Sequence, residues 1–219
     1  MDIEVLVSYL PKYTEAFWLT VMIGVYGILT AFLLGILAAF FIHFKVPVFS
    51  HIFRVYIELF RNTPLLVQLF FIYFGLPKIG ISISAEICGV LGLGLLGGSY
   101  MAEGFRSGLE AVSYSQTEGA LALGMTRRQM FFYVIFPEAL ALSIPATIAN
   151  VIFLLKETSV FSAISLMDLM FTAKDLIGLY YNTSEALFLL VVFYVVMLLP
   201  VSFLGNVIEK RVHYKMFGE

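Results

Sequence analysis

Two uncharged windows, Ala16–Ile42 and Ala186–Ile208, constrain the fold of this chain more than any other feature of its sequence. A helix needs about 20 apolar residues to cross the hydrocarbon of a bilayer, and each window is long enough to do so. Hydrophobic residues make up 61% of the chain and charged residues only 13%, outside the usual range of soluble domains. The sequence therefore predicts an all-α membrane protein.

Three shorter windows lie between these two, so we expect five transmembrane helices in a single domain that fills residues 1–219. The expected spans cover residues 16–42, 55–77, 85–105, 137–158 and 185–208. The fourth span begins at Pro137, a residue suited to the first turn of a helix. Thr63-Pro64 in the second span either caps a new helix or kinks a continuous one, because proline lacks a backbone donor.

Lysine and arginine are distributed unevenly between the two sides of the predicted bundle. With the N-terminus outside, nine of them fall on inner segments and three on outer ones, which agrees with the positive-inside rule. The inner set is Lys45, Arg54, Arg61, Arg106, Arg127, Arg128, Lys210, Arg211 and Lys215, and the outer set is Lys12, Lys78 and Lys174. We therefore expect residues 106–136 and the C-terminus in the cytoplasm. Residues 159–185 should face out and carry a short surface helix.

The segment 118–137 is a polar, cationic stretch within an otherwise apolar chain. Its apolar residues recur at helical spacing, but Gly124 interrupts them, which favours two short helices joined by a turn. A bent amphipathic helix on the cytoplasmic side of a membrane protein offers a ridge that a soluble partner can bind.

Several classes of function lack support in the sequence. The net charge of −2 gives no sign of nucleic-acid binding, and the single cysteine, Cys88, cannot form a disulfide framework. The three histidines, His43, His51 and His213, are scattered, and neither a nucleophile motif nor a glycine-rich phosphate loop is present. We therefore expect a non-enzymatic chain that binds no cofactor and no metal. Five spans cannot divide into equal repeats, which favours a dimerising half-transporter over a self-contained carrier.

The polar stretch resembles the cytoplasmic loop signature of ABC-importer permeases, which reads Glu-Ala-Ala, three residues, Gly, nine residues, Ile, one residue, Leu-Pro. The matching positions here are Glu118, Gly119, Ala120, Gly124, Val134, Phe136 and Pro137. Four further segments resemble the permeases of polar amino-acid importers, and the resemblance covers nearly the whole chain. These segments are Tyr56–Leu69, Tyr73–Pro77, Tyr100–Arg106 and Leu154–Ser159.

The resemblance implies a type I importer fold, with a cytoplasmic coupling-helix loop between helices 3 and 4. It implies a permease subunit that moves a polar amino acid across the bacterial inner membrane by alternating access. The expected partners are cytoplasmic ATPase subunits that hold ATP and Mg, a second permease copy or a paralogue, an external substrate-binding protein and membrane lipid. Residues Glu118, Gly119, Ala120, Gly124 and Pro137 would couple the chain to the ATPase. The alternative function is a channel or secondary carrier without an ATPase.

Four residues are candidates for the substrate pathway, and each has a structural alternative. They are Gln68, Tyr100, Glu157 and Thr158. Gln68 would contact substrate or form an interhelical hydrogen bond, and Tyr100 would line the pore from a span whose glycines favour tight packing. Glu157 and Thr158 would meet an amino acid at the outer mouth, or Glu157 would form a surface pair with Lys156.

Two further features bear on the same pathway. The family often has asparagine at the position of Leu96, so this chain lacks an amide near the expected site. The spacing of Arg54, Glu58 and Arg61 permits an ion network on the surface of one helix.

Overall fold

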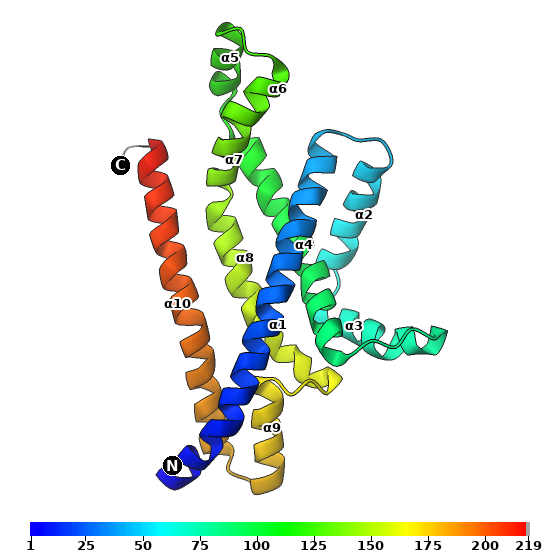
Figure 1. Cartoon of the computed structure of the whole chain (residues 1–219), viewed down its shortest axis with the longest axis vertical. Helices are drawn as coiled ribbons and strands as arrows, with labels where there is room; N and C mark the ends of the chain where they lie inside the picture. Colours follow the sequence, from blue (N-terminus) through cyan, green and yellow to red (C-terminus); the bar gives the residue numbers. More distant parts are fainter. Residues whose placement is uncertain (218–219) are drawn as a thin grey trace.

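The computed structural model describes residues 1–217, and all regular secondary structure in that range is helical. The last two residues of the expected domain, Gly218 and Glu219, lie outside the described residues. The molecule is an elongated bundle in which α1 (Ile3–His43), α4 (Ala85–Ala111) and α10 (Thr183–Phe217) run lengthwise (Figure 1). At one end, which we call the α5 end, α5 (Tyr114–Ala122) and α6 (Arg127–Met130) project beyond the bundle. At the opposite α9 end lie the N-terminus and α9 (Leu169–Tyr180).

Four helices are long and apolar enough to cross a membrane, and a bent pair of helices forms a candidate fifth span. The four are Ile3–His43, Ala85–Ala111, Ile144–Ile164 and Thr183–Val212. The first begins 13 residues before the expected boundary, because the side chain of Asp2 accepts a hydrogen bond from the backbone N–H of Glu4 and caps the helix. The elements are helical, as predicted, and their number reaches the predicted five spans when the bent pair is counted as one span.

The segment expected as the span 55–77 is sharply bent. Its first part, α2 (Phe49–Arg61), ends before Thr63-Pro64, and its second part starts with α3 (Leu65–Phe70), at an angle of 106°. Pro64 is extended, with ψ of 142°, and has no N–H with which to continue the helix. The two helical segments that continue α3 are Phe71–Gly75 and Leu76–Ile79. Of the two sequence interpretations of Thr63-Pro64, the structure supports the start of a new helix.

Small residues bring α1 and α4 into close contact. Ala31 and Ala38 are fully buried on α1, and a Cβ atom added to Gly97 would lie only 2.7 Å from the Cβ of Ala31. A Cβ on Gly98 would lie 2.8 Å from the Cβ of Leu34. The glycines of the third span therefore pack helices tightly, as predicted, and leave little room for larger side chains.

The fourth expected span, residues 137–158, is divided between α7 (Phe136–Leu142) and α8 (Ile144–Glu157). The part long enough to cross a membrane is Ile144–Ile164, because α8 continues as a 3-10 segment, Thr158–Ile164. The chain then turns into α9, so the expected short helix within residues 159–185 is present. The α9 helix packs on α1 and α10 through the buried side chains of Leu169, Ala173 and Leu176. Close by, the hydroxyl of Tyr13 donates a hydrogen bond to the carbonyl oxygen of Ala186 at 2.6 Å.

Asp168 begins α9 and is fully buried. Its Oδ1 atom accepts a hydrogen bond from the backbone N–H of Phe171 at 2.8 Å, whereas its Oδ2 atom has no partner among the described residues. Burial of the carboxylate raises the pKa of Asp168 to about 7, because the charged form loses its hydration. This group therefore titrates near neutral pH.

Candidate functional site

The projecting α5–α6 segment contains two short helices and a turn, as the sequence predicts. Gly124 forms the turn with φ of 75°, a left-handed conformation that glycine adopts without strain. Thr126 and Gln129 then form a reciprocal capping box that starts α6. The turn is thus fixed by local chemistry on both sides.

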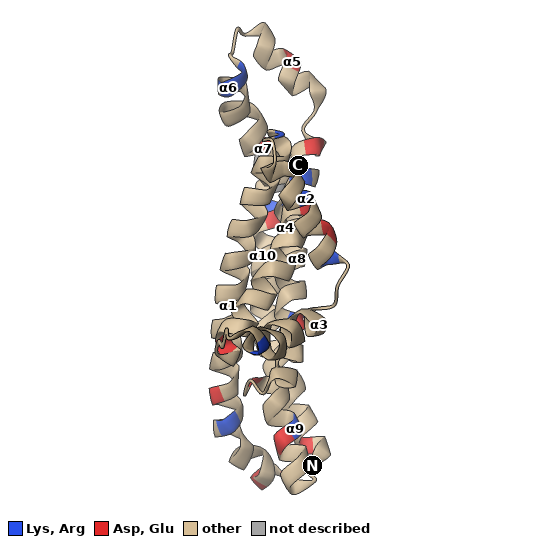
Figure 2. Ribbon diagram, turned by 90° about the vertical axis from the view of Figure 1, so that its right-hand side faces the viewer, with Lys and Arg blue, Asp and Glu red and all other residues tan. Residues whose placement is uncertain are grey.

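The surface of this segment combines charged and large apolar side chains. Glu118 and Gly119 are exposed, while Ala120 is buried. Leu123 next to the turn is 80% exposed, and Tyr133 is 74% exposed. Figure 2 shows an acidic residue on α5 and basic residues on α6 at this end of the molecule. Exposed apolar side chains rimmed by charge are typical of an interaction surface.

The α5–α6 segment is attached to the bundle through aromatic contacts. Phe131, which follows α6, packs against His43 and Phe44 at the end of α1, with ring centroids 5.5 Å and 4.9 Å apart. The π-helical segment Phe131–Ile135 then leads into α7, where Pro137 occupies the first turn. The α5–α6 segment is therefore connected both to the end of α1 and to α7.

A cavity of about 410 Å³ lies where the α2–α3 break meets α4 and α8. Among the described residues that line it, only Arg61 and Glu157 are charged, and they carry opposite charges. The cavity is lined by Arg61, Asn62, Thr63, Pro64, Leu65, Leu66, Leu96, Tyr100, Phe153, Glu157 and Val160. We call it the dipolar cavity. Two predicted pathway residues, Tyr100 and Glu157, therefore meet here, together with Leu96.

The other two pathway candidates lie elsewhere. The Nε2 atom of Gln68 donates to the carbonyl oxygens of Phe60 and Thr63, each at 3.0 Å, so its amide joins α3 to the end of α2. The hydroxyl of Thr158 donates to the carbonyl oxygen of Leu155 at 2.7 Å and is fully buried. Neither side chain lines the dipolar cavity.

Arg61 is the site residue that sequence reasoning placed differently. Its Nη1 atom lies 3.4 Å from Oε2 of Glu103 on α4, and its guanidinium carbon lies 5.4 Å from the ring centroid of Tyr100. The described residues show no ion pair between Arg54, Glu58 and Arg61 of the kind the spacing permits. The sequence feature that could have indicated this contact is the position of Arg61 shortly before Thr63-Pro64. Arg61 is the last residue of α2 before the break and so reaches toward the neighbouring helix.

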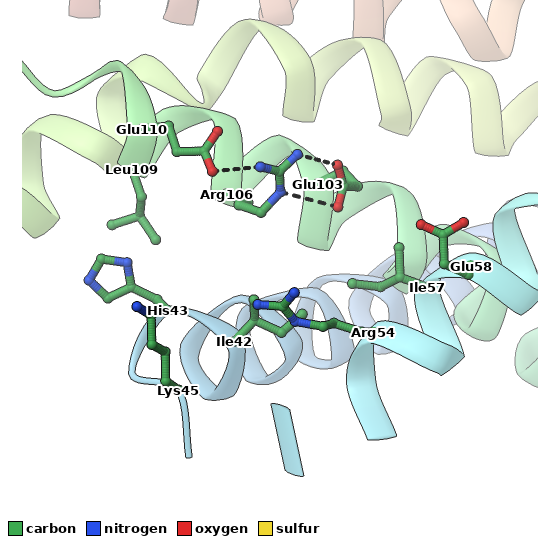
Figure 3. Close-up of a pocket in the computed structure, with 10 residues that line it drawn as sticks. All are labelled: Ile42, His43, Lys45, Arg54, Ile57, Glu58, Glu103, Arg106, Leu109 and Glu110. Carbon is green, nitrogen blue, oxygen red and sulfur yellow. Dashed lines mark hydrogen bonds and ion pairs between the residues drawn. The ribbon is translucent and has the colours of Figure 1, made fainter. Parts of the chain in front are cut away.

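A second cavity, of about 750 Å³, lies closer to the α5 end between α1, α2 and α4. Figure 3 shows its lining, with the carboxylate of Glu103 facing the guanidinium of Arg106. Arg106 donates to both oxygens of Glu103, at 3.3 Å and 2.8 Å, and also donates to Glu110. We call this space the charged vestibule. The described part of the chain contains no group of three His, Cys, Asp or Glu residues that could hold a metal ion.

The chain is similar to membrane components of known transport systems. Residues 31–214 match the model of the family described as binding-protein-dependent transport system inner membrane component. The probable amino-acid permease protein YxeN of Bacillus subtilis is 35% identical over 177 residues, which cover 80% of this chain and 79% of that protein. The probable glutamine ABC transporter permease GlnM of the same organism is 28% identical, over 96% of this chain and 98% of its own.

Solved structures show the same similarity. A chain in a crystal structure of an amino acid ABC transporter with histidines superposes with a TM-score of 0.90 at 33% sequence identity. That match covers 96% of this chain and 99% of the other. A chain of the MetNI methionine ABC transporter in an inward-facing conformation, at 20% identity, has a TM-score of 0.77 and shares the fold.

Proposed function

The chain belongs to the family of inner-membrane components of binding-protein-dependent transport systems, and from this premise we propose that it forms the translocation pathway for a polar amino acid. It is a permease component of an amino-acid ABC transporter. In this proposal, transport proceeds inward by alternating access. ATP hydrolysis belongs to a separate subunit, which would bind the ATP and Mg.

The dipolar cavity is the observation that carries the proposal. A free amino acid has a carboxylate and an ammonium group, and the cavity offers one cation, Arg61, and one anion, Glu157. Arginine binds carboxylates through two parallel hydrogen bonds, and charge-assisted hydrogen bonds are about twice as strong as neutral ones. The phenol of Tyr100 and the backbone around the break would supply further polar contacts. The cavity thus suits a zwitterion better than an inorganic ion.

The α5–α6 segment is the proposed docking element for the ATPase. Its ridge of Glu118, Gly119, Ala120 and the turn at Gly124 projects beyond the bundle, and Leu123 exposes apolar surface beside that turn. Phe131 and Pro137 connect the ridge to α1 and to the fourth span. ATP inside and delivered substrate outside would each favour one of two global states, which is the thermodynamic requirement for coupling.

The remaining parts of the assembly follow from the same proposal. The α5 end faces the cytoplasm of a bacterial cell and the α9 end faces out, in agreement with the positive-inside distribution of Lys and Arg. A second permease, identical or paralogous, completes the pathway, and an external binding protein delivers substrate at the α9 end.

Purification of the tagged chain from native membranes tests the proposal against a channel or secondary carrier. We expect a stoichiometric ATPase to copurify, and the reconstituted complex to accumulate a polar amino acid only when ATP is supplied. A permease that purifies without an ATPase and equilibrates amino acids across liposomes would establish the alternative.

A further inference from the structure

The two cavities are arranged in series along the same two helices. On α4, Leu96 and Tyr100 line the dipolar cavity, whereas Glu103, Arg106 and Glu110 line the charged vestibule. The α2 helix also lines both cavities, but it reaches the vestibule first and the dipolar cavity last along the chain. There, Arg61 lines the dipolar cavity, while Arg54, Ile57 and Glu58 line the vestibule. Both helices therefore pass from one cavity to the other at a single level of the bundle.

The ion pair between Arg61 and Glu103 lies at that level. It joins the last residue of α2, in the lining of the dipolar cavity, to the first α4 residue of the vestibule lining, at 3.4 Å. Tyr100 stacks on the same guanidinium from within the dipolar cavity. We propose that the Arg61–Glu103 pair, backed by Tyr100, is a gate that separates the dipolar cavity from the charged vestibule, and that the vestibule is the inward release route of this subunit. This inference rests on the proposed function for the direction of release.

The ion network makes this pair suitable for repeated opening. Arg106 binds both oxygens of Glu103, so the carboxylate keeps a bidentate partner when Arg61 moves away. Arg61 contributes one longer contact to Glu103 and is 38% exposed at its side chain. A charged group left unpaired in a partly buried site is costly, and this arrangement avoids that cost for Glu103. The Arg61 contact is therefore the one that can break.

The vestibule has a composition suited to a departing zwitterion. Its walls alternate in charge along α4, with Arg106 between Glu103 and Glu110, and Arg54 faces them from α2 (Figure 3). On α4, Arg106 pairs with both Glu103 and Glu110, so these three charges each lie beside a charge of opposite sign. Such a wall hydrates and guides a zwitterion without holding it tightly.

Thiol accessibility from the α5 side tests the gate without requiring a known substrate. In a Cys88→Ala background, Leu96→Cys places a thiol in the dipolar cavity and Leu109→Cys places one in the vestibule. Inside-out vesicles containing the complete complex are treated with the membrane-impermeant anion MTSES, and the modification rates are measured. We expect Glu103→Gln to raise the modification rate at Leu96→Cys about tenfold or more. Arg61→Gln removes the other partner of the ion pair and should raise the rate by a similar factor.

Glu110→Gln is the matched control, because it removes the same charge from the same helix while leaving Arg61 and Glu103 in contact. It should leave the rate at Leu96→Cys unchanged. The rate at Leu109→Cys should stay constant in all three variants, which verifies that the bundle remains folded. Unchanged rates at Leu96→Cys in both gate variants, or an equal increase with Glu110→Gln, would overturn the gate. Failure to transport amino acids would instead refute the proposed function and leave this readout intact.

Discussion

The hydroxyl of Tyr56 on α2 donates a hydrogen bond to the carbonyl oxygen of Leu95 on α4 at 2.6 Å. This contact fits only because residue 98, one turn further along α4, is glycine. A Cβ atom there would lie 2.5 Å from the hydroxyl oxygen of Tyr56. The junction of α2 with α4, on which both cavities depend, thus requires a backbone without a side chain.

Gly98→Ala should accordingly weaken the packing of α2 on α4. Overpacking of a tight interface typically costs about 1–3 kcal/mol, and the loss of the Tyr56 hydrogen bond would add to that cost. We expect a lower thermal unfolding midpoint for the purified permease. Gly119→Ala is the control, since no atom lies within 4 Å of its added Cβ and alanine is the better helix former. A Gly98→Ala protein as stable as Gly119→Ala would contradict this account of the junction.

Gly124→Asp should uncouple the permease from its ATPase. The substitution places a charged side chain on the exposed turn and strains a left-handed backbone position. We expect uptake and stimulated ATP hydrolysis to fall together while the chain still inserts in the membrane. Gly80→Asp is the matched control, because Gly80 also has a positive φ, of 85°, and no atom lies within 4 Å of its added Cβ. Gly80 lies in the turn after Leu76–Ile79, away from α5 and α6. Normal ATPase stimulation with Gly124→Asp would exclude this turn from docking.

Asp168 makes stability depend on pH. Its pKa is raised to about 7 in the folded chain, so the folded state binds the proton more tightly than the unfolded state does. The free energy of unfolding is then greatest below about pH 4, falls as pH rises toward about 7, and is constant above that. The total decrease is about 1.4 kcal/mol for each tenfold difference in proton affinity between the folded and unfolded states. Asp168→Asn keeps a capping side chain and removes the buried charge.

We therefore expect Asp168→Asn to raise the unfolding midpoint at pH 8 and to flatten its pH dependence between pH 4 and 8. Asp175→Asn on the same helix removes an exposed carboxylate and should leave the pH profile unchanged. If Asp168→Asn follows the parent profile, the buried carboxylate is not the titrating group.

The proposed orientation can be checked by labelling single cysteines in a Cys88→Ala background. Leu123→Cys at the α5 end should react only from the cytoplasmic side, and Leu179→Cys on α9 only from outside, since both positions are exposed. Labelling of Leu123→Cys in intact cells by an impermeant reagent would reverse the assigned topology.

Features that depend on a single helix could be predicted from the sequence, whereas contacts between helices could not. Uncharged length predicted the spans and Gly124 predicted the turn, because each depends on local backbone chemistry. Thr63-Pro64 offered a new helix and a kinked continuous helix as alternatives, and the structure decided between them. The partner of Arg61 could not be found in this way, since Glu103 is 42 positions away in the chain and lies on another helix. Helical spacing could offer Arg61 only neighbours on its own helix.

The same limit explains the mixed result for the pathway residues. Tyr100 and Glu157 line the dipolar cavity, which depends on how α4 and α8 face the break. Gln68 lies close to that break in sequence, yet its amide bonds back to Phe60 and Thr63. The sequence predicted a helical span for all three residues, whereas the direction of each side chain depends on how the helices pack.

If the dipolar cavity binds the transported amino acid, Glu157→Gln should weaken binding of that amino acid. Substrate-dependent ATP hydrolysis by the complete complex is measured in liposomes against the concentration of the amino acid that the parent accumulates. Losing a charge-assisted hydrogen bond costs about 1.5–3 kcal/mol, so the half-maximal concentration should rise about tenfold or more. Lys156→Gln removes the adjacent exposed charge, which does not line the cavity, and should behave like the parent. An unchanged concentration dependence for Glu157→Gln, with the ATPase still bound, would contradict the account.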